Sequence, residues 1–115
     1  MYNVIEDKSF QFAVRIVNLN KHLQEKKSEF VLAKQILRAG TSIGANVAEA
    51  QQAQSRADFI SKLTIALKET AETKYWLRLL FATEYISQAE YDSMHMDCVE
   101  LEKILVSIVK STKSI

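Results

Sequence analysis

The sequence predicts an all-α protein that folds as an antiparallel up-and-down four-helix bundle. The chain has 115 residues, of which 48% are hydrophobic and 25% are charged, as is typical of one globular domain spanning residues 1–115. Apolar residues recur at spacings of three and four along four segments, which is the periodicity of amphipathic helices. Only short segments separate them, and short connections favour antiparallel neighbours. We therefore expect helices over residues 5–24, 29–53, 56–85 and 88–111.

Serine residues mark the expected helix starts, because a serine side chain can accept a hydrogen bond from a free N–H of the first turn. The candidate caps are Ser9, Ser28, Ser55 and Ser87. Asp58 lies three residues after Ser55, and Glu90 lies three residues after Ser87. This spacing is typical of a capping box.

Both glycines of the chain, Gly40 and Gly44, fall inside the second expected helix, in the stretch RAGTSIGANVAEA. A glycine in a helix interior costs about 1 kcal/mol relative to alanine, so its presence needs a reason. Alanines surround the pair, and we expect a neighbouring helix to pack closely there. A glycine loop that binds phosphate would need a preceding strand, which the sequence does not predict.

The first expected helix carries two apolar stripes, of which one bundle core can use only one fully. The core stripe comprises Ile5, Phe12, Ile16, Leu19 and Leu23. The second stripe, with Phe10, Val14 and Val17, lies either beneath a neighbouring helix or against another subunit. In the third expected helix, Trp76 and Leu79 lie partly off the core stripe and are further interface candidates. A broad core stripe accounts for Trp76 equally well.

Charge is unevenly distributed along the chain although the net charge is only +1. Residues 1–78 contain twelve Lys or Arg against eight Asp or Glu, whereas residues 79–102 contain none against six. A basic face of this kind attracts nucleic acid, and the candidate phosphate-binding residues are Arg15, Lys34, Arg38, Arg56 and Lys62. The same residues could instead form an ordinary solvent-exposed helix surface that binds no nucleic acid. Arg38 and Glu49 lie three turns apart, too far to pair along one helix, so each is expected to meet a partner on another helix or subunit, with Glu72 and Arg78 as candidates.

No catalytic, metal or cofactor site is predicted, so we expect a protein that is not an enzyme. Cys98 is the only cysteine and lies on the core stripe of the fourth expected helix. His95 is on neighbouring helix surface, but two ligands without a third do not make a metal site. No apolar run approaches the roughly 18 residues that span a membrane, and no signal peptide precedes the first helix. A cytoplasmic location without membrane contact is expected.

Two segments, LRAGTSIGANVAEA at residues 37–50 and DFISKLTIALKETAETKYWLRLL at residues 58–80, resemble a known bacterial family. These are four-helix bundle proteins often encoded in intervening sequences of the large-subunit ribosomal RNA gene. The resemblance implies an up-and-down bundle that assembles as a homopentamer. It also implies a relationship to accessory proteins of diversity-generating retroelements, which bind reverse transcriptase and nucleic acid. It implies no catalytic residue.

Two function classes follow from these observations. The first is a noncatalytic homo-oligomeric scaffold that binds RNA or another nucleic acid through its basic surface. The second is an oligomeric adaptor for a protein partner, without nucleic-acid binding. The surplus apolar stripe predicts self-association only, and the number five comes from the resemblance. Affinity for RNA at two salt concentrations distinguishes the classes, because phosphate contacts weaken steeply as salt rises.

Overall fold

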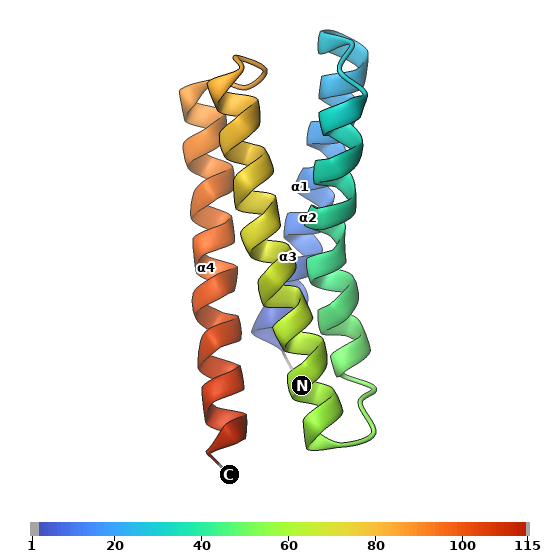
Figure 1. Cartoon of the computed structure of the whole chain (residues 1–115), viewed down its shortest axis with the longest axis vertical. Helices are drawn as coiled ribbons and strands as arrows, with labels where there is room; N and C mark the ends of the chain where they lie inside the picture. The colour runs from blue at the N-terminus through green and yellow to red at the C-terminus, as the bar shows by residue number, and fades with distance from the viewer. Residues whose placement is uncertain (1–2, 115) are drawn as a thin grey trace.

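The computed structural model describes residues 3–114 and confirms the predicted four-helix bundle (Figure 1). The helices are α1 (Val4–Lys27), α2 (Val31–Ala50), α3 (Arg56–Ala82) and α4 (Gln88–Lys113), and the described residues contain no strand. Consecutive helices run antiparallel and pack side by side, which forms a rod of 47 × 23 × 21 Å. The α1–α4 contact that closes the bundle is the least extensive of the four.

Two of the predicted serine caps are wrong. The cap of α1 is Asn3, whose side chain accepts a hydrogen bond from the Glu6 N–H at 3.1 Å, whereas Ser9 is buried inside the helix. Ser28 ends α1 rather than starting α2, because its backbone is left-handed (φ 52°) and its N–H bonds to the Leu23 carbonyl.

The Glu29 carboxylate takes over the predicted role of Ser28 at the start of α2. It accepts hydrogen bonds from the backbone N–H groups of Leu32 at 2.5 Å and Ala33 at 3.0 Å. A carboxylate in this position satisfies free donors of the first turn and complements the positive end of the helix dipole.

The other two serine caps are confirmed. The Ser55 hydroxyl accepts from the Asp58 N–H at 3.0 Å, and Ser87 forms a reciprocal capping box with Glu90. This box lowers the pKa of Glu90. The largest cause is the hydrogen bond from the Ser87 backbone N–H, and the hydrogen bond with the Ser87 side chain adds a smaller effect. The helix ends differ from expectation, since α2 ends at Ala50 rather than 53 and α3 at Ala82 rather than 85. Beyond α3, left-handed Glu84 (φ 67°) turns the chain toward α4.

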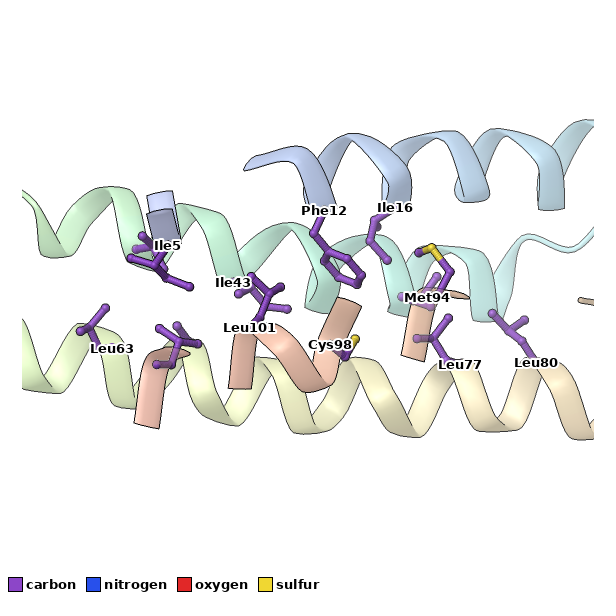
Figure 2. Close-up of a cluster of buried hydrophobic side chains, with 14 of the residues drawn as sticks. Ile5, Phe12, Ile16, Ile43, Leu63, Leu77, Leu80, Met94, Cys98 and Leu101 are labelled. Atoms are coloured by element: carbon purple, nitrogen blue, oxygen red, sulfur yellow. The ribbon is translucent and has the colours of Figure 1, made fainter. Parts of the chain in front are cut away.

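Side chains from all four helices fill the core (Figure 2). The labelled members are Ile5, Phe12, Ile16, Ile43, Leu63, Leu77, Leu80, Met94, Cys98 and Leu101. Thr70 and Thr73 are also fully buried, and their hydroxyls donate to the carbonyls of Ala66 and Glu69 one turn earlier. These bonds satisfy the two hydroxyl donors without a partner from another helix.

Candidate interaction surfaces

The candidate phosphate-binding residues Arg15, Lys62 and Arg38 form ion pairs within the chain. The Arg15 guanidinium lies 2.5 Å from Asp97 and donates to the Ser93 hydroxyl at 3.0 Å. Lys62 pairs with Glu49 at 3.2 Å. These pairs partly neutralise the basic surface that the composition predicts.

Arg38 is the third of these residues, and its predicted pairing with Glu72 is confirmed. Its guanidinium also lies 3.5 Å from the Glu69 carboxylate, while half of the Arg38 side chain remains exposed. The predicted pairing of Glu49 with Arg78 is wrong, because antiparallel packing places the start of α3, with Lys62, beside the end of α2. Arg78 is about 24 Å further along α3 at 1.5 Å per residue.

The acidic segment of the sequence is balanced by cations from other helices. Three of its carboxylates pair at 2.5–3.1 Å across helix contacts. The pairs are Lys8–Glu100, Arg15–Asp97 and Lys74–Glu102. The first two link α1 to α4 and the third links α3 to α4, so much of the charge asymmetry along the sequence cancels in the fold.

Lys34 and Arg56 are exposed, Lys34 on α2 and Arg56 at the start of α3. Lys34 precedes Arg38 by about one helical turn, so the two side chains are neighbours on the surface of α2. Four of the five candidates therefore lie on α2 and α3, and the structure separates Arg15 from them on α1.

Glu72 connects Arg38 to Trp76. The Trp76 indole Nε1 donates to a Glu72 oxygen at 2.9 Å, and the same oxygen receives a bond from Arg38. The indole hydrogen bond, followed by the Arg38 contact, lowers the pKa of Glu72 against the opposing effect of desolvation. Trp76 is half-buried against the core, so its ring orientation is fixed within the chain.

The second apolar stripe of α1 lies at the surface. Phe10, Val14 and Val17 are 62%, 41% and 36% exposed, so no helix of the described chain covers them. Beside Phe10, a groove of about 640 Å³ runs between α1 and α2. The residues that line this α1–α2 groove are Asn3, Glu6, Asp7, Phe10, Ala13, Thr41, Gly44, Ala45 and Ala48.

The two glycines lie where α2 faces α1. A β-carbon at Gly44 would lie 3.1 Å from the Ser9 carbonyl oxygen, which belongs to the α1 backbone. At Gly40, a β-carbon would lie 2.6–2.9 Å from three side-chain carbons of Ile16, inside van der Waals contact. Gly44 also lines the groove, where its missing side chain leaves the surface hollow.

A further apolar surface lies on the outer side of α3, which we call the α3 ridge: Ile65, Lys68, Tyr75 and Leu79. Tyr75 is 56% exposed and packs edge-to-face on Trp76 with ring centroids 5.1 Å apart. Ile65 is 38% exposed, and the interface candidate Leu79 is half-buried. Sequence reasoning missed Tyr75 and Ile65, although their spacings of three, seven and four residues along the ridge are those of one helical face.

Cys98 and His95, the two residues considered as metal ligands, belong to no metal-binding cluster in the described part of the chain. Among residues 3–114, no three His, Cys, Asp or Glu side chains come together as a metal-binding group. Burial raises the pKa of the Cys98 thiol to about 12, so it stays protonated at neutral pH and is a poor nucleophile. His95 stacks on Tyr91 with ring centroids 5.4 Å apart. None of the described helices is long and apolar enough to cross a membrane.

The fold and its surfaces define a small all-helical bundle with two exposed apolar faces. The chain belongs to the 23S rRNA-intervening sequence protein family, whose model matches residues 3–107. It is also similar to the crystal structure of a protein of unknown function from the S23 ribosomal protein family of Bacteroides thetaiotaomicron VPI-5482. The two chains share 63% sequence identity over 94% of this chain and 96% of that one, with a TM-score of 0.93. No curated protein matches the sequence significantly.

Proposed function

We propose that the chain is a noncatalytic, self-associating helical scaffold in the cytoplasm. The observation that carries the proposal is the exposed apolar stripe of Phe10, Val14 and Val17 beside the α1–α2 groove. A contiguous apolar surface next to a groove is typical of a protein interface. A homopentamer is the assembly that the family resemblance suggests, and the stripe supplies the surface that any such assembly needs.

The test of self-association is light scattering on the parent and on Val14→Glu. We expect the parent to be an oligomer and Val14→Glu to be a monomer, because burying an unpaired carboxylate at an interface is costly. Circular dichroism should show unchanged helix content, since Val14 is exposed within the chain. A stable monomeric parent would refute the proposal, and unfolding of Val14→Glu would show that the stripe belongs to the core.

We further propose that the scaffold binds the backbone of RNA or another nucleic acid through α2 and α3. Lys34 and the exposed half of Arg38 supply neighbouring donors on α2, and Arg56 adds a charge at the start of α3. The family name refers to 23S rRNA and agrees with this proposal. Because Glu72 and Glu69 compete for Arg38, we expect weak binding. Contacts to the phosphate backbone do not read the bases, so the affinity should depend little on the RNA sequence.

The test is fluorescence anisotropy with a structured RNA at about 50 mM and about 200 mM salt, over which phosphate contacts lose most of their strength. Replacing Lys34 and Arg38 together by glutamine should weaken binding at the lower concentration. The matched control replaces Lys103 and Lys110 together by glutamine, which likewise removes two exposed charges, here from α4. Absence of binding at low salt would favour an adaptor for a protein partner, and unchanged affinity of the double variant would remove both residues from the site.

A further inference from the structure

We propose that the α1–α2 groove of one copy receives the α3 ridge of a second copy, so that two different surfaces meet. This inference rests on the proposed self-association and assigns its two sides. An interface between unlike surfaces leaves one groove and one ridge free at the ends of each pair, and further copies can therefore add until a ring closes.

The shapes of the two surfaces are complementary. Five of the residues that line the groove are small: Ala13, Thr41, Gly44, Ala45 and Ala48. Residues of this size let a helix approach closely. The α3 ridge projects large side chains instead, with Tyr75 56% exposed and Ile65 38% exposed. A groove of about 640 Å³ has room for side chains of this size.

Contact between a groove and a ridge also covers more of the exposed apolar surface than contact between two grooves or two ridges. If two grooves met, Tyr75 and Ile65 would stay exposed in the assembly, and if two ridges met, Phe10 would stay exposed. Contact between groove and ridge covers both apolar faces with one type of interface. The groove lies between α1 and α2 whereas the ridge lies on the outer side of α3, so one copy can use both at the same time.

The charges on the two surfaces are complementary, because Glu72, which lies on the same face of α3 as the ridge, is already paired with Arg38 of α2 and leaves Lys68 as the exposed charge. Glu6 and Asp7 lie at the end of the groove formed by the first turns of α1. Lys68 is exposed in the middle of the ridge, between Ile65 and Tyr75. Opposite charges at the rim of an interface guide orientation and disfavour contact between two like surfaces.

The experiment uses Phe10→Glu, which alters the groove, and Tyr75→Glu, which alters the ridge. Light scattering and circular dichroism are recorded for the parent, for each variant and for an equimolar mixture of the two. We expect each variant alone to be a helical monomer. In the mixture we expect a one-to-one heterodimer, because one intact ridge and one intact groove remain to form a single interface. The control Met96→Glu, at a 71% exposed position of α4, should keep the parental assembly.

Each other outcome is decisive. If the parent is an oligomer and Tyr75→Glu keeps the parental size, the ridge is not part of the interface and only this inference fails. If both variants are monomers that stay monomeric when mixed, groove and ridge do not contact each other. A monomeric parent would instead refute the proposed self-association itself. If Tyr75→Glu unfolds, Tyr75→Ser supplies a milder change, and its full assembly would again overturn the assignment.

Discussion

The contact between Gly40 and Ile16 leads to a prediction in which two known effects oppose each other. Replacing Gly40 by alanine should stabilise α2 by about 1 kcal/mol, because glycine is a poor helix former. The added β-carbon, however, would lie 2.6–2.9 Å from three carbons of Ile16, which is fully buried. Overpacking of this kind costs about 1–3 kcal/mol. We therefore expect Gly40→Ala to lower the free energy of unfolding by up to about 2 kcal/mol.

The assay is equilibrium denaturation followed by circular dichroism, with Ser61→Ala as the matched control. Ser61 is exposed on α3, so alanine there should be neutral or slightly stabilising. A decisive second step is the same glycine change in an Ile16→Ala background, where the clashing carbons are absent. We expect Gly40→Ala to become stabilising there, by about 1 kcal/mol.

The reversal of sign is what identifies the clash. If Gly40→Ala stabilises the parent as much as it stabilises the Ile16→Ala variant, α1 and α2 adjust without cost at this position. The glycine would then not be needed for close packing. Residues in contact usually show coupling of about 0.5–3 kcal/mol in such a cycle, which is within reach of the measurement.

Three further outcomes are expected. Gly44→Leu should lower the melting temperature more than Ser61→Leu, because only the first forces a side chain against the α1 backbone at Ser9. Glu72 should contribute its stabilisation fully above pH 4.5 and lose it as the pH falls through its lowered pKa, and Trp76→Phe should raise that pKa in an NMR titration. Cys98 should resist thiol labelling in the native protein at pH 8 and react once denaturant unfolds it, and rapid native labelling would contradict its burial.

Local sequence signals predicted the helices well but not every boundary. Spacings of three and four identified all four helices, and the Ser87–Glu90 capping box was predicted with its partner. Ser28 was misassigned because a short polar residue favours both the start and the end of a helix. Its left-handed backbone is coupled to the hydrogen bond from the Ser28 N–H to the Leu23 carbonyl. The local sequence pattern does not specify that this bond forms.

Pairing between helices was only partly predictable, because it depends on register. The Arg38–Glu72 pair was predicted, whereas Glu49 was assigned to Arg78 instead of Lys62. The short α2–α3 connection places the end of α2 beside the start of α3. The sequence alone does not give the axial offset between the two helices. Tyr75 was missed for a related reason, since the exposed side of α3 is known only after its core side is placed.

The placement of charges changes how the basic character of the sequence should be interpreted. Lys8 and Arg15 on α1, with Lys74 on α3, are paired to carboxylates of α4. Because α1 and α4 share the least extensive helix contact, two of these ion pairs lie where apolar packing contributes least. Partly exposed pairs add little stability but disfavour a wrong arrangement of like-charged helices. Much of the basic surplus thus serves the arrangement of the bundle, and the exposed apolar faces are the stronger evidence for an interaction partner.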